Sequence, residues 1–265
     1  MPNLQIKKSS TCTIGADPEL FLVNNVGKFI SSIGKFGGTK QAPRPLKSHI
    51  KGLMVQEDNV AVEFNIPYAK KLSTFRSYIN GGLRAIEKEA KKLRLKLSIS
   101  PSAEFEDDQL QDQRARVFGC EPDFNVWTLQ MNPRPHAVNK NLRSAGGHLH
   151  YGYTKDRIGL GRSCDLFLGC PSILFDSDQN RRLLYGKAGC IRQKSYGIEY
   201  RTLSNFWLKS NELIDMVFSQ SVQAIKFVDS GNTIPKQDAL KIIKCINNSD
   251  QRLLSELTEK YGLMY

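Results

Sequence analysis

The sequence predicts a single α+β domain in which helices are grouped against a largely antiparallel sheet. The first observation is size, because 265 residues, 40% of them hydrophobic and 24% charged, can bury a substantial core. The second is that short segments with a two-residue alternation are interspersed with segments whose apolar residues recur every three or four positions. The third is that no internal repeat or low-complexity linker divides the chain. We therefore expect one domain over residues 1–265.

The first third of the chain is expected to contribute strands, a basic loop and a long helix. Segment 10–23, "STCTIGADPELFLV", predicts a strand, a turn at Asp17 and Pro18, and a second strand with Glu19 near its start. Segment 34–49 is rich in Gly, Pro and Lys, which is typical of a surface loop or a ligand-covering one. Apolar residues at helical spacing predict an amphipathic helix over 72–97, whose middle is weakened by two adjacent glycines.

Three further segments each direct polar residues to one side of a strand. In "VAVEFNI", residues 60–66, the alternation places Glu63 and Asn65 opposite an apolar face. In "GGHLHYGY", His148 and His150 share a face, and in "YGIEYRTLSN" Glu199 and Arg201 do. Each pair alone is readily explained as a solvated face, or as two histidines with ordinary hydrogen bonds. All three together on one sheet face would suit divalent metals that bridge phosphate oxygens.

The remaining segments complete the α+β pattern. Segment 97–105 predicts a strand, and 117–127 a strand or loop. Segment 160–178 is apolar enough for a buried helix, and 176–186 predicts a short helix with an acidic start. Helices are expected at about 210–228, 236–246 and 249–261.

Composition limits the class of protein. No apolar run approaches the length of a membrane span, and the N-terminus lacks the apolar core of a signal peptide, so we expect a cytoplasmic protein with no membrane partner. The six cysteines form no C-x-x-C pair, which predicts free thiols instead of a zinc ribbon or disulfide framework. A net charge of +12 indicates anionic partners such as nucleotide phosphates, an acidic substrate or nucleic acid, unless it serves solubility alone.

Four motifs in order resemble a known family. "GADPE", "EDNVAVEFN", "SAGGHLHYGY" and "YGKAGCIRQKSYGIEYRTLSN" are similar to segments of the phage-type carboxylate-amine ligases of the glutamine synthetase-like superfamily, which includes glutamate-cysteine ligases. The resemblance runs from about residue 13 to residue 228. The helical segment from about 229 to 265 falls outside it.

The resemblance implies a curved antiparallel sheet of the glutamine synthetase catalytic type, with helices on its outer face. It implies an ATP-dependent amidoligase that uses Mg²⁺ or Mn²⁺ and forms an acyl phosphate from a carboxylate, which an amine then attacks. The expected partners are a nucleotide, a small-molecule or peptide carboxylate, and an amine, in the host cytoplasm if the protein is phage-encoded. Nucleic acid is a possible partner that this reading does not favour, and the motifs leave the oligomeric state open.

The resemblance also assigns roles to residues of this chain. The implied metal ligands are Glu19, Glu63, His148 and Glu199, with Glu57 as a second candidate beside Glu63. His150 would lie near the nucleotide phosphates, and Arg201 would bind a phosphate. Arg192 and Arg182 would add positive charge opposite the transferred phosphoryl group, a role that suits guanidinium better than ammonium. The implied catalytic residues are Glu63, Arg192 and Arg201, and the implied nucleotide-binding residues are His150, Arg182 and Arg201.

Two other classes of protein remain open. A metal-dependent hydrolase could use His148, His150 and a carboxylate to bind zinc and activate water. That class rarely needs the Glu-x-Arg strand, and the sequence has no H-E-x-x-H motif. A non-catalytic nucleic-acid-binding protein would explain the charge but not three polar strand faces. Nucleotide turnover discriminates among the three.

Overall fold

One large antiparallel sheet organises the protein. The computed structural model describes residues 12–116, 123–133 and 139–265. In these parts the sheet has eleven strands in the order β3-β4-β5-β1-β11-β13-β12-β8-β9, with β2 and β6 also paired to β1. All of its pairings are antiparallel, which confirms the predicted α+β class. The strands are β1 (Ile14–Val23), β2 (Phe29–Ile30), β3 (Arg44–Pro45), β4 (Met54–Asp58), β5 (Ala61–Asn65), β6 (Lys96–Ser98), β8 (Phe124–Asn125), β9 (Gln130–Met131), β11 (Gly147–Tyr151), β12 (Cys190–Lys194) and β13 (Gly197–Tyr200). A separate pair joins β7 (Ser102–Glu104) to β10 (Leu142–Ser144).

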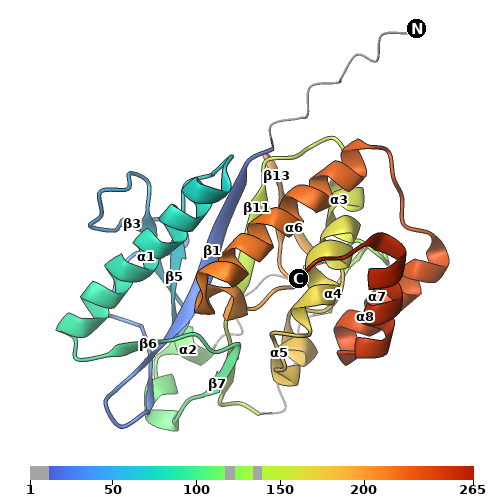
Figure 1. Ribbon diagram of the computed structural model, residues 1–265. Helices are drawn as coiled ribbons and strands as arrows, with labels where there is room; N and C mark the ends of the chain where they lie inside the picture. The colour runs from blue at the N-terminus through green and yellow to red at the C-terminus, as the bar shows by residue number, and fades with distance from the viewer. Residues whose placement is uncertain (1–11, 117–122, 134–138) are drawn as a thin grey trace, which may run out of the picture.

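The long helices lie across one side of this sheet (Figure 1). The helices are α1 (Leu72–Lys92), α2 (Gln113–Arg116), α3 (Arg157–Cys164), α4 (Cys170–Ser172), α5 (Gln179–Leu184), α6 (Asn211–Asp229), α7 (Lys236–Asn248) and α8 (Gln251–Tyr261). A π-helical turn, Asp165–Gly169, joins α3 to α4, and 3-10 turns occur at Asp107–Leu110 and Asn205–Lys209. Helices α7 and α8 bury apolar side chains in the same core cluster as the sheet, among them Ile242, Ile246 and Leu254. No helix in the described residues is both long and apolar enough to cross a membrane.

The two glycines of α1 bring the helix close to the sheet. A Cβ at Gly82 would lie 2.4 Å from two ring carbons of Phe64, and one at Gly81 would lie 2.2 Å from a methyl of Ile50. The expected weakness in the middle of this helix is therefore offset by close packing, because apolar groups that interdigitate this tightly gain dispersion contacts. The helix ends at Lys92, five residues before the predicted 97, because Lys96–Ser98 pairs with β1 as β6.

The N-terminal segment differs from its prediction. The expected turn at Asp17 and Pro18 is absent, and Ile14–Val23 is one continuous strand. Proline has no N–H to give to a ladder, yet the strand continues because Asp17 and Pro18 both stay in register with β11, opposite His148 and Gly147. Asp17 therefore points along the same face as Glu19.

Other elements follow the sequence more closely. The expected strand 60–66, the histidine strand and the helices near 160–178 and 210–261 are present. The segment expected as one strand over 97–105 is divided into β6 and β7, with Pro101 in the break. Part of 117–127 lies outside the described residues, and its remainder contains β8. The five described cysteines are free, as expected.

Candidate active site

The register of six neighbouring strands brings polar residues to one sheet face. Across this face Gln56 pairs with Glu63, Glu63 with Glu19, and Asp17 with His148. The row continues through His150, which pairs with Glu199, to Arg192. Residues that alternate with them point to the helices and are fully buried: Leu20, Val62, Leu149, Tyr200 and Ile191. The alternation of side chains along these strands therefore places the hydrophobic core on one side of the sheet and a charged face on the other.

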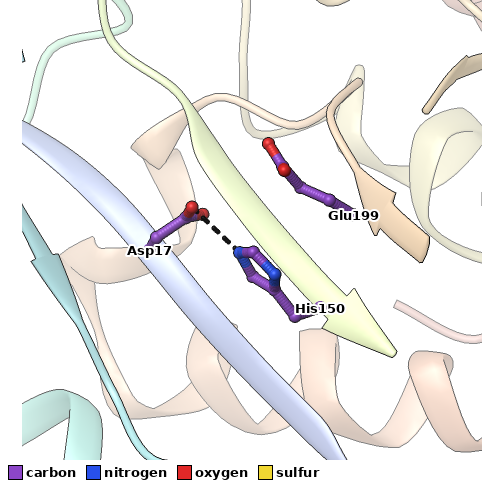
Figure 2. A group of neighbouring side chains, drawn as sticks. All are labelled: Asp17, His150 and Glu199. Atoms are coloured by element: carbon purple, nitrogen blue, oxygen red, sulfur yellow. Dashed lines mark ion pairs between the residues drawn. The ribbon is translucent and has the colours of Figure 1, made fainter. Parts of the chain in front are cut away.

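Carboxylates and imidazoles gather on the charged face in two groups. Asp17, His150 and Glu199 come from β1, β11 and β13, and each offers a ligand atom within 4.8 Å of the others' (Figure 2). The second group consists of Glu19, Asp58 and Glu63, with the same spacing. Carboxylate oxygen with imidazole nitrogen is a donor set that suits a divalent cation such as Mg²⁺ or Mn²⁺.

The two histidines occupy different positions in this face. His148 is buried between the groups, with Nδ1 3.5 Å from Asp17, 3.9 Å from Glu19 and 3.8 Å from Glu199. His150 has Nε2 2.9 Å from a carboxylate oxygen of Asp17 and Nδ1 2.5 Å from the hydroxyl of Tyr196. The geometry brings both imidazoles to the metal-ligand groups, and the division of roles between them stays a prediction.

The titration of these carboxylates reflects crowded negative charge. Burial raises the pKa of Glu63 well above its ordinary value, and the neighbouring charges of Asp17 and Asp58 raise it further. Burial would also raise the pKa of Asp17, but the charge of His150 and hydrogen bonds from both histidines hold it below its ordinary value. A buried carboxylate surrounded by others is stabilised in its charged form when a cation binds. The residues of both groups therefore fit a divalent metal.

Cationic side chains cover the other end of the face. Burial would raise the pKa of Glu199, but the Arg201 guanidinium in direct contact holds it at about 2. Lys194 Nζ lies 2.9 Å from Glu199, and Arg192 lies 3.3 Å from it. Arg201 is also paired at 2.8 Å with the buried Asp123. Carboxylates thus adjoin cationic side chains on this face, an arrangement that suits phosphate oxygens bridged by metal ions.

Three cavities adjoin one another along this face. The central one contains both ligand groups and is bordered by Lys40, Arg192, Lys194 and Tyr196. At one end, past His150, an apolar cleft is lined by Ile66, Tyr68, Tyr196 and the bare backbone of Gly15 and Gly152. At the other end, past His148, a third cavity is lined by Ser144, Gly146, Arg143, Arg181 and Tyr185.

Comparison with known proteins finds one similar family. Residues 138–254 match the model of a family described as phage phiEco32-like COOH.NH2 ligase-type 2. The match confirms the resemblance to carboxylate-amine ligases. It supports a ligase enzyme. The motif resemblance ends at about residue 228, whereas the matched region continues through α7 into α8.

Other comparisons are distant. A solved structure described as apo GmaS without ligand is similar at a TM-score of 0.44 and 12% identity, covering 94% of this chain. This chain spans 66% of the length of that one. No curated protein matches the sequence significantly.

Two residues implied by the ligase resemblance lie outside the site. The Glu57 carboxylate accepts hydrogen bonds of 2.8–2.9 Å from the backbone N–H groups of residues 34–37, so it shapes the basic loop and does not face the metal-ligand groups. The reason is alternation along β4, which turns Gln56 and Asp58 to the site and Glu57 away. Arg182 donates to the carbonyls of Ile246 and Asp176 and binds the C-terminal helices to the core.

Four residues line the candidate site although the motifs do not assign them to it: Asp17, Asp58, Asp123 and Lys194. Asp17 precedes a proline, and Asp58 lies in the segment Glu-Asp-Asn, and both patterns are local turn signals that hide a place in a strand. The two-residue spacing of Asp17 and Glu19 is the signal that would have found the first. Lys194 has the same spacing from Arg192, but no strand was expected there.

Proposed function

We propose that the protein couples ATP cleavage to amide formation between a carboxylate and an amine, through an acyl phosphate. The observation that carries the proposal is the continuous polar face in which two groups of metal-ligating residues adjoin Arg192, Lys194 and Arg201. Divalent cations bound there would neutralise phosphate oxygens and orient the transferred group. A carboxylate oxygen is a poor leaving group, so its phosphorylation is what makes attack by an amine possible.

The three cavities suggest how the substrates are arranged. We assign the nucleotide base to the cleft beside Tyr68 and Tyr196, since aromatic walls and an open glycine floor suit a flat ring. The phosphates then extend past His150 to the central cavity. The acid is assigned to the cavity lined by Arg181 and Arg143, because guanidinium groups suit the binding of a carboxylate.

The residues of this chain then have separable tasks. An oxygen of the acid attacks the terminal phosphorus and ADP departs, while Arg201 and Arg192 face the charge that develops on the phosphoryl oxygens. The amine next attacks the acyl carbon and inorganic phosphate departs. The amine must lose a proton in this step. Asp58 lines both the central cavity and the cavity assigned to the acid, and Glu63 belongs to the same ligand group, so these two carboxylates would hold the amine and accept the proton.

An activated-acid assay tests the proposal. Pooled carboxylates are incubated with ATP, Mg²⁺ and hydroxylamine, which replaces the natural amine and traps the acyl phosphate as a hydroxamate. The expected products are ADP, phosphate and a hydroxamate, all absent with the Glu63→Gln variant. Stoichiometric AMP and pyrophosphate would refute the acyl phosphate. Zinc-dependent hydrolysis without any ATP requirement would support the hydrolase instead.

A further inference from the structure

The strongest unassigned feature of the charged face is the concentration of cations on Glu199. This carboxylate is only 1% exposed, yet Arg201, Arg192 and Lys194 all contact it. The buried Asp123 pairs with Arg201 at 2.8 Å and lies 3.9 Å from Arg192. Three cations therefore gather beside the ligand groups at this end of the face, where a bound polyanion could contact them.

Lys194 differs from the two arginines in how it is held. Its side chain is 30% exposed, against 17% for Arg192 and 5% for Arg201, and among the described residues it forms an ion pair with Glu199. Arg201 is held by both carboxylates. A lysine ammonium on a flexible stem changes position more readily than a guanidinium bonded on two sides. Lys194 is therefore the cation that leaves Glu199 at the lowest cost.

The position of Lys194 shows which part of a bound ligand its ammonium would contact if it left Glu199. It is the last residue of β12, and Tyr196 in the same hairpin borders both the central cavity and the apolar cleft. A nucleotide whose base lies in the cleft and whose phosphates lie over the ligand groups passes directly beside this hairpin. We propose that Lys194 binds the β- and γ-phosphates of ATP. In the absence of nucleotide Glu199 holds the Lys194 ammonium in place, and when ATP binds the ammonium moves from Glu199 to these phosphates. This inference rests on the proposed ATP-dependent function.

Nucleotide affinity, measured without turnover, tests the inference. ATP and AMP are titrated calorimetrically into the wild-type protein and the Lys194→Ala variant in the presence of Mg²⁺. One lost charge-assisted hydrogen bond predicts that the variant binds ATP about tenfold more weakly or worse. Its affinity for AMP should be unchanged, because AMP lacks the distal phosphates. Lys194→Arg should recover part of the ATP affinity.

Lys155 supplies the matched control. It also pairs with a carboxylate, Asp229, at 3.2 Å, but it lines none of the three cavities. Lys155→Ala should bind ATP and AMP like the wild type. An equal loss of ATP and AMP affinity in Lys194→Ala, or no loss of either, would overturn the inference while leaving the proposed function intact. Failure of the wild-type protein to bind ATP at all would overturn both.

Discussion

A buried acid in the core makes the stability of the protein depend on pH. Asp165 lies in the π-helical turn between α3 and α4 and is 0% exposed. It accepts hydrogen bonds from Trp127 Nε1 at 2.6 Å and the Tyr200 hydroxyl at 2.8 Å, with Thr202 Oγ1 at 3.3 Å. Burial raises its pKa from 3.8 to about 7, although these hydrogen bonds oppose the rise.

The size of the effect follows from this shift. A change of about three pKa units corresponds to about 4 kcal/mol, since one unit is about 1.4 kcal/mol. Because the folded protein holds the proton more tightly than the unfolded chain, protonated Asp165 contributes fully below about pH 4. That contribution is lost as the pH rises towards about 7, so the free energy of unfolding should fall across this window.

Asp165→Asn isolates the effect from other titrating groups. The amide oxygen can accept from Trp127, and the amide nitrogen can donate to the hydroxyl of Tyr200, so the shape and most hydrogen bonds are kept. Urea unfolding of both proteins between pH 4 and pH 8 should show the variant gaining up to about 4 kcal/mol relative to the wild type as the pH rises. Parallel pH profiles for the two proteins would refute the reasoning.

Three further predictions concern the site and its support. Glu63→Gln should abolish hydroxamate formation while leaving the melting temperature equal or higher, because the change removes the charge that burial and nearby carboxylates disfavour; a normal rate in this variant would contradict the role. His148→Ala should respond to excess Mg²⁺ or Mn²⁺ by partial recovery of the rate, whereas His150→Ala should chiefly raise the ATP requirement; titrating metal at fixed ATP, and ATP at fixed metal, compares them, and identical responses would refute the division of roles. Gly82→Ala should lower the free energy of unfolding by about 1–3 kcal/mol through overpacking against Phe64; unchanged urea denaturation would show that the helix moves freely.

The sequence predicted those parts of the site that depend on strand alternation. Glu63, His148 and Glu199 share one face because a two-residue period is a local property of the backbone. Which strands become neighbours is decided by packing and pairing between distant segments, and the family resemblance supplied only the expectation that the three polar faces belong to one site. Without it, three separate polar pairs would have remained three separate surface features.

The errors have a common physical cause. Asp-Pro is a strong local turn signal, but in β1 the pairing of Asp17 with His148 overrides it. Arg181 and Arg182 are adjacent on one short helix, and only the fold shows that the first borders the cavity beside Ser144 while the second faces the C-terminal helices. Neighbouring residues of one type cannot be distinguished before the surroundings of each are known.

Because the same strands supply both the core and the charged face, a register error in one strand would affect both. A slip of β11 by one residue against β1 would exchange His148 and His150 with Leu149 and Tyr151. Two imidazoles would then enter the packed interior, and a leucine would lie among the carboxylates of the charged face. Such a molecule would lose both its stability and its activity, so a misregistered β11 cannot give a folded but inactive protein. As sequences of this kind evolve, selection for catalytic activity would therefore also preserve the core residues of β11.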